Sequence, residues 1–191
     1  QVCSAVKRLY VERSIYDIFV KKLVEKLETV MVGNPEESVQ FGPLVSKKQL
    51  DLLVSQVEEA KIAGATVVIG GNKPSGKEFE KGNYYLPTIL TNVNPDMRVV
   101  AEEVFGPVLP IAAFADEAQA IRMANHTPYG LTAEILTGNP EKGARVASQI
   151  QAGGVSINMD VSYNPDSPIG GYKKSGLGRE YGIEGFRELT Q

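Results

Sequence analysis

Residues 46–69 read SKKQLDLLVSQVEEAKIAGATVVI, and this stretch decides the class of fold. Ser46 with Gln49 three residues later is the capping-box pattern that begins a helix. Gly64 is a residue type that ends helices, and a β-branched run at residues 66–69 follows directly. A helix, a glycine and a short apolar strand form one step of an α/β unit, whose strand we expect to be buried on both faces. The helix is expected to bury Leu50, Leu53, Val54, Val57 and Ala60.

The chain on either side of this stretch repeats the same two patterns. Ser14, with Asp17 three residues later, can cap a first helix. Helical patterns cover residues 15–30, 116–126 and 140–152, and Asp116 is expected to cap the second of these helices. Strand patterns cover residues 85–93, 108–114, 131–137 and 154–157. These patterns predict an α/β fold with an open, mainly parallel twisted sheet and helices on both of its faces.

Two segments lack periodicity. Residues 70–82 are rich in Gly, Lys and Pro and are expected to form a surface loop. Residues 158–178 contain several glycines and prolines, and long irregular segments of this kind often line a site.

The composition indicates one globular domain that acts on a small molecule. The chain has 191 residues, of which 42% are hydrophobic and 23% are charged, and its net charge is −3. Without a block of like charge, we expect no nucleic-acid partner and no membrane surface. No apolar run approaches the ~20 residues of a membrane span, no signal-peptide pattern is present, and one cysteine cannot form an internal disulfide. A cytoplasmic location is therefore expected.

The single cysteine, Cys3, is the candidate nucleophile. Taken alone, a free cysteine is more often a small buried apolar residue than a catalytic one. His126, the only histidine, is expected at a helix C-terminus, where the helix dipole explains it. One cysteine and one histidine do not make a metal-ligand set, so no metal site is expected.

Four motifs resemble segments of the aldehyde dehydrogenase superfamily. Gln1 to Arg8 follows the pattern Gln-x-Cys-x-Ala-x-x-Arg that surrounds the family's reactive cysteine. Residues 102–108, about a hundred positions later, read Glu-Glu-Val-Phe-Gly-Pro-Val and resemble a second family motif. Residues 124–131 and 168–180 are similar to two further segments, so the resemblance covers the whole chain.

The resemblance implies a reaction and assigns residues to it. Cys3 would attack an aldehyde to form a hemithioacetal, NAD or NADP would accept hydride, and water would cleave the resulting thioester to give a carboxylic acid. Glu103 would hold the nicotinamide ribose and Phe105 would pack beside the nicotinamide. Without the resemblance, Glu103 could be a solvated charge in a turn and Phe105 a part of the core.

The resemblance also indicates a substrate tunnel. Its predicted residues are Ser4, Val161, Tyr163 and Ile169. Many family members have phenylalanine at the position of Ile169, so an aromatic substrate is disfavoured. Residues 158–169 contain no Lys or Arg that could clamp a carboxylate, which favours a neutral aliphatic aldehyde.

Compared with the family, residues 1–191 correspond to the C-terminal catalytic-domain portion. The N-terminal NAD-binding domain, the water-activating glutamate, the oxyanion-binding asparagine and the C-terminal oligomerisation strand are absent from it. We therefore expect the chain to be inactive alone, and the full-length enzyme to be a homodimer or homotetramer. The choice between NAD and NADP stays open.

Two alternatives remain. In a CoA-acylating aldehyde dehydrogenase, CoA rather than water would take the acyl group, although the motif at residues 102–107 favours hydrolysis. A non-catalytic truncated structural or interaction module would also be compatible with the size and helix–sheet pattern of the chain.

Overall fold

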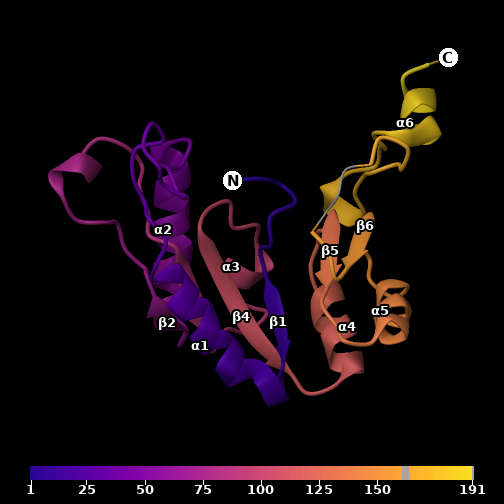
Figure 1. The fold of residues 1–191 in the computed structure, drawn as a ribbon, viewed down its shortest axis with the longest axis horizontal. Coiled ribbons are helices and arrows are strands. Elements are labelled where there is room, and N and C mark those ends of the chain that lie inside the picture. Colours follow the sequence, from indigo (N-terminus) through magenta and orange to yellow (C-terminus); the bar gives the residue numbers. More distant parts are fainter. Residues whose placement is uncertain (161–163, 191) are drawn as a thin grey trace. The chain divides into compact units, whose positions relative to one another are not determined.

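The computed structural model describes residues 1–160 and 164–190, and it divides into two compact units, Gln1–Ala115 and Asp116–Gln191 (Figure 1). The first unit contains the strands β1 (Leu9–Glu12), β2 (Thr66–Ile69), β3 (Thr88–Thr91) and β4 (Val108–Phe114). Its helices are α1 (Tyr16–Leu27), α2 (Lys47–Ile62) and α3 (Arg98–Ala101).

The four strands of the first unit form one sheet in the order β1-β4-β3-β2. β1 is parallel to β4, with Leu9 opposite Ile111, and β3 is also parallel to β4, with Thr88 opposite Val108. Only β2 runs antiparallel, at the edge beside β3. The prediction of a mainly parallel sheet is therefore confirmed.

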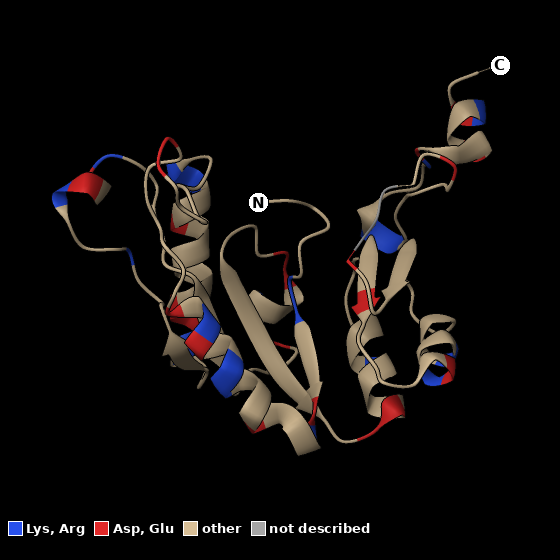
Figure 2. Ribbon diagram, viewed as in Figure 1, with Lys and Arg blue, Asp and Glu red and all other residues tan. Residues whose placement is uncertain are grey.

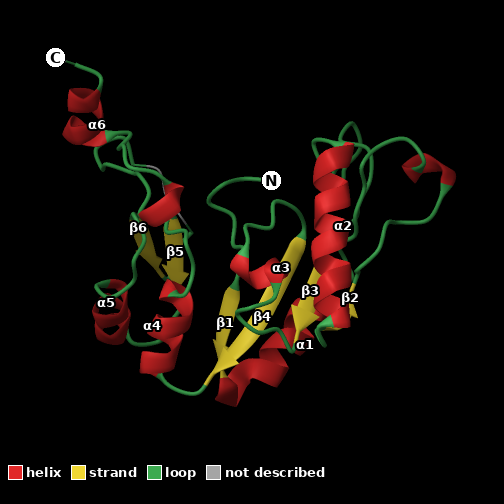
Figure 3. Ribbon diagram, turned by 180° about the vertical axis from the view of Figure 1, so that it is seen from behind, coloured by secondary structure: helices red, strands yellow, loops and turns green. Residues whose placement is uncertain are grey.

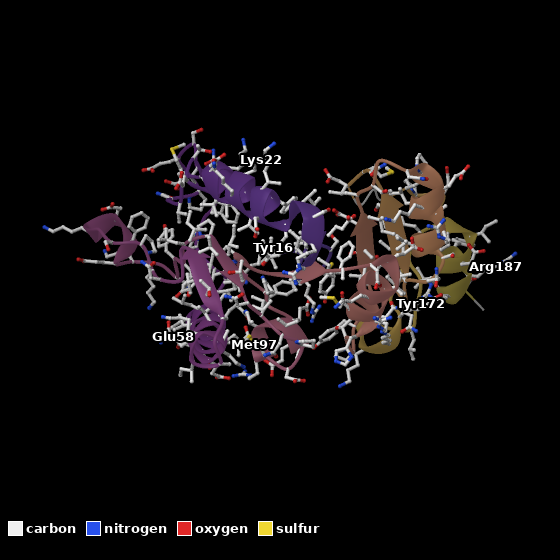
Figure 4. All side chains as sticks on the ribbon, turned by 90° about the horizontal axis from the view of Figure 1, so that it is seen from below. Tyr16, Lys22, Glu58, Met97, Tyr172 and Arg187 are labelled. Atoms are coloured by element: carbon white, nitrogen blue, oxygen red, sulfur yellow. The ribbon has the colours of Figure 1, made fainter. Side chains whose placement is uncertain are left out.

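Helices cover both faces of this sheet, as predicted (Figure 3). Ile89 and Leu90 are adjacent on β3 and fully buried, and they belong to different apolar clusters because successive strand residues point to opposite faces. Ile89 packs with the residues of α1, and Leu90 with those of α2 and α3. Tyr16 of α1 lies against the first of these faces and donates a hydrogen bond of 3.1 Å to the Ile111 carbonyl (Figure 4).

The helix α2 follows the prediction closely. The hydroxyl of Ser46 accepts a hydrogen bond of 3.2 Å from the Gln49 N–H, which confirms the cap. Gly64 follows the helix with a φ of 100°, in the left-handed region that favours glycine. Of the expected core residues, four are buried and Val54 is half-buried.

Three local predictions for the first unit were wrong or incomplete. Ser14 does not cap α1; its hydroxyl donates instead to the Glu12 carboxylate at 2.9 Å, and a short 3-10 turn over Arg13–Ile15 leads into the helix. β2 is not buried on both faces, because it is an edge strand whose residues alternate between exposed and half-buried. β1 and α3 were not predicted, since each is only four residues long and neither shows a period.

The second unit contains α4 (Glu117–Asn125), β5 (Thr132–Ile135), α5 (Pro140–Ala147), β6 (Gly154–Ile157) and α6 (Gly182–Glu188). β5 and β6 pair in parallel. The Asp116 carboxylate caps α4 by accepting the Gln119 N–H at 2.7 Å, and His126 ends that helix, as predicted. Apart from a short 3-10 turn at Lys173–Ser175, the described part of residues 158–178 is irregular, also as predicted.

Charged residues of both signs are distributed over the helices. Figure 2 shows Lys and Arg interspersed with Asp and Glu on α1 and α2. Within residues 1–160 and 164–190, no helix has the length and apolar character needed to cross a membrane.

Gly106, between α3 and β4, tests the packing of this core. A Cβ at Gly106 would lie 2.1 Å from Leu53 Cδ1, and Leu53 is fully buried on α2. We expect Gly106→Ala to reduce the free energy of unfolding by about 1–3 kcal/mol, measured by urea denaturation, because the core must shift to admit the methyl group.

The double variant Gly106→Ala/Leu53→Ala provides the control. Leu53→Ala alone should cost about 2–5 kcal/mol through the cavity it leaves. If the alanine methyl of residue 106 enters that space, the double variant will lose less stability than the sum of the single variants. Strict additivity would show that the two side chains do not compete for the same volume.

Candidate active site

The parallel pairing of β1 with β4 brings two distant segments to one edge of the sheet. Residues 1–8 lead into β1 and residues 102–107 lead into β4, and parallel strands begin at the same edge. Cys3 is in the first of these segments, and Glu103 and Phe105 are in the second. Two motifs about a hundred residues apart are therefore neighbours.

Side chains from the first segment bond directly to the second. The Gln1 amide donates to the Phe105 carbonyl at 2.9 Å, and its oxygen accepts the Val45 N–H at 2.8 Å. The Arg8 guanidinium donates to the Val100 carbonyl and, at 3.1 Å, to the Glu102 carbonyl. Gln1 and Arg8 are the two ends of the cysteine motif, so both ends are attached to residues 100–105.

A network of ion pairs links residue Glu102 of the second segment to α3 and α2. Arg98, at the start of α3, pairs with Glu102 at 3.0 Å and with Glu59 of α2 at 2.6 Å. The amide of Gln56 donates to the Glu102 carboxylate at 3.1 Å. The hydrogen bond from Arg98 lowers the pKa of Glu102 below its ordinary value. Hydrogen bonds from Ser55 and Arg98 lower the pKa of Glu59 in the same way.

One lysine, Lys7, interacts with residues of both motifs. Cys3 is a free, exposed thiol. The Lys7 ammonium lies 5.0 Å from the centre of the Phe105 ring. Burial lowers the pKa of Lys7, while the negative charges of Glu103 and of the Cys3 thiolate act in the opposite direction. The structure thus brings Cys3, Glu103 and Phe105 into one electrostatic environment.

Chemically, this edge offers a thiol, a carboxylate and an aromatic ring. Glu103 is exposed, and its oxygens can accept hydrogen bonds from the hydroxyls of a sugar. Phe105 is half-buried, which leaves part of the ring available to a planar group. These three side chains suit the assigned tasks of nucleophile, ribose acceptor and nicotinamide neighbour, and those roles stay predictions.

The predicted tunnel residues that the structure describes belong to different units. Ser4 is half-buried in the first unit, next to Cys3. Ile169, in the second unit, is half-buried and pairs with Glu180 through two backbone hydrogen bonds of 2.8 and 2.7 Å. Val161 and Tyr163 lie outside the described residues.

Other candidate features do not coincide with this edge. A groove of about 460 Å³ beside α1 is lined by residues such as Tyr16, Val20 and Val68, and it contains none of the predicted site residues. Among the residues that the structure describes, no cluster of His, Cys, Asp and Glu could hold a metal ion.

Sequence reasoning missed Lys7 and the network around Glu102. Lys7 occupies a variable position of the cysteine motif, so the motif assigns no role to it. Gln56 carried a detectable signal, because it is a polar residue next to the apolar stripe of α2, and the structure buries it to 1% exposure. The partner of Arg98 in α2, Glu59, could not be inferred from spacing because it is 39 residues away.

Comparison with known proteins identifies similar sequences and structures. The sequence model of the aldehyde dehydrogenase family matches residues 1–191. Betaine aldehyde dehydrogenase of Brucella anthropi is 41% identical over all of this chain and 39% of its own length. The enzyme of the same name from Vibrio vulnificus is 40% identical over all of this chain and 40% of its own length. The chain thus spans about two-fifths of the length of these relatives.

A solved structure shows the same likeness. The crystal structure of Staphylococcus aureus betaine aldehyde dehydrogenase in complex with NAD+ superimposes with a TM-score of 0.94 at 38% identity. The superposition covers 98% of this chain and 37% of that one.

The Arg98 network predicts a dependence of stability on pH. Because the pKa values of Glu102 and Glu59 are lowered on folding, the network stabilises the fold fully above the unfolded glutamate pKa of about 4.3. This contribution is lost as the pH falls through the lower pKa values of the folded state. We expect Arg98→Met to lower the urea midpoint at pH 7, with a difference from wild type that shrinks below pH ~4.3.

Lys48→Met is the control, because Lys48 is an exposed lysine on the same helix as Glu59. It should leave the urea midpoint nearly unchanged both at pH 7 and below pH ~4.3. A difference between Arg98→Met and wild type that stays constant across the acid range would contradict the assignment.

Proposed function

The chain belongs to the aldehyde dehydrogenase family, and on that premise we propose that it serves the NAD(P)-dependent oxidation of an aldehyde to a carboxylic acid, with Cys3 as the nucleophile. The observation that supports the proposal is the junction of residues 1–8 with residues 100–105, where the Gln1 amide and the Arg8 guanidinium join the cysteine motif to the motif that contains Glu103 and Phe105. Nothing in a purely structural module requires an exposed thiol at such a junction.

The steps assigned to this chain begin with the thiolate. Cys3 attacks the aldehyde carbon, a C–S bond forms, and the carbonyl oxygen takes up the negative charge of a hemithioacetal. Bound NAD or NADP would accept the hydride that leaves the same carbon, so that a thioester remains on Cys3. Attack of water on this thioester releases the acid and restores the thiol.

Glu103 and Phe105 are proposed to hold the nicotinamide end of the cofactor. The exposed Glu103 carboxylate would accept hydrogen bonds from ribose hydroxyls, and the Phe105 ring would border the nicotinamide plane. NAD is supported by the Staphylococcus aureus relative, whose structure was solved with NAD+.

For the substrate we propose a neutral aliphatic aldehyde. Asp160 and Asp166 are exposed on the irregular segment after β6, and residues 158–169 contain no basic side chain to bind a carboxylate. The names of the relatives point to betaine aldehyde, which carries a fixed positive charge instead. Comparing kcat/KM of the full-length enzyme for hexanal, betaine aldehyde and succinic semialdehyde distinguishes the three charge classes, and a preference for either charged substrate contradicts the proposal.

The nucleophile is tested by Cys3→Ser. In the full-length enzyme, we expect the substitution to reduce aldehyde-dependent NADH formation by roughly 10³-fold or more, as removal of a covalent nucleophile does in other enzymes. Ser38→Ala, on an exposed loop, is the control and should retain the wild-type rate.

A second measurement does not depend on the cofactor. After treatment with p-nitrophenyl acetate, mass spectrometry of peptides should find the acetyl group on Cys3 of the wild-type chain. If Cys3→Ser still oxidises the aldehyde, or if the acetyl group is found on residues other than Cys3, the proposed role of Cys3 is refuted.

A further inference from the structure

Lys7 folds back over the turn that carries the nucleophile. Its ammonium group donates to the Val2 carbonyl at 2.7 Å and to the Ala5 carbonyl at 2.9 Å. Ala5 N–H donates to the same Val2 carbonyl at 3.1 Å, which closes a turn over residues 2–5. Cys3 lies within this turn, so a single side chain bridges the backbone on both sides of the thiol.

The same ammonium group also contacts the motif at residues 102–108. It lies 5.0 Å from the centre of the Phe105 ring, within the range of a cation–π interaction. The Phe105 carbonyl meanwhile accepts the Gln1 amide. The turn is thus held to Phe105 from two directions, by Gln1 through the backbone and by Lys7 through the ring.

Lys7 is also the cation on the turn that carries the thiol. Burial lowers the pKa of Lys7, and the negative charges of Glu103 and Cys3 oppose this effect. The neighbouring Arg8 also acts on Lys7, but its guanidinium is bonded to the carbonyls of Val100 and Glu102.

We infer that Lys7 is a positioning residue for Cys3: it fixes the turn over residues 2–5 against Phe105 and places a positive charge on the turn that carries the thiol. This inference rests on the proposed function of Cys3 as nucleophile and adds to it a source of orientation and charge stabilisation. A positive charge near a thiol favours the thiolate and stabilises negative charge that develops next to it. Glu103, the anion near the same ammonium, opposes this effect in part.

Alkylation of Cys3 tests the inference without requiring aldehyde oxidation. Thiolate sulfur displaces iodide from either iodoacetamide, which is neutral, or iodoacetate, which is anionic. Lys7→Met removes the charge, so the rate with iodoacetate should fall about threefold more than the rate with iodoacetamide, as expected for one unit charge several Å away near a wet surface.

Two further variants separate charge from structure. Lys7→Gln keeps a donor for the two carbonyls but lacks the charge, and it should show the same reagent preference as Lys7→Met. Lys7→Arg keeps the charge and should restore the preference of the wild type. Lys22→Met is the control, because Lys22 is exposed on the outer side of α1 (Figure 4).

The outcomes are distinct. If Lys7→Met and Lys7→Gln react like Lys22→Met with both reagents, the inference is overturned. Equal losses with both reagents would show a structural effect only and would overturn the electrostatic part. Absence of aldehyde turnover would instead concern the proposed function, since alkylation reports on Cys3 alone.

Discussion

The parallel pairing of β1 with β4 is the constraint on which the rest of the candidate site depends. β1 has only four residues, and its register places Leu9 opposite Ile111. Because the strands run in the same direction, the segments that precede them begin at the same edge. If β1 were antiparallel to β4, residues 1–8 would be at the opposite end of the sheet from Glu103 and Phe105, and the two motifs could not form one site.

This edge is supported by polar groups that an apolar core alone could not orient. The carbonyls of Val100 and Glu102 end a short helix and require donors, and Arg8 supplies them. On the other side of the same segment, the Glu102 carboxylate is held by Arg98 and Gln56. The backbone and the side chain of Glu102 are therefore held by different partners, and the next residue, Glu103, is exposed.

Local signals predicted most of the secondary structure, and their failures have physical causes. Ser46 and Asp116 were correctly identified as caps because a cap depends only on a side chain and the N–H three residues later. Ser14 has the same local pattern, but Glu12 competes for its hydroxyl and a 3-10 turn replaces the capped start. β2 was expected to be buried on both faces because a helix, a glycine and a short apolar strand form one step of an α/β unit, and this local pattern cannot show that the strand lies at a sheet edge.

The sequence by itself determined the α/β class, the order of most elements, the family and the identity of the candidate nucleophile, because periodicity, caps and motifs are properties of neighbouring residues. The tertiary structure alone decided which distant residues meet. The fold alone places the Lys7 ammonium over Phe105 and against the carbonyls on both sides of Cys3, and it alone pairs Arg98 with Glu59. Such contacts depend on strand order and register, which no local pattern encodes.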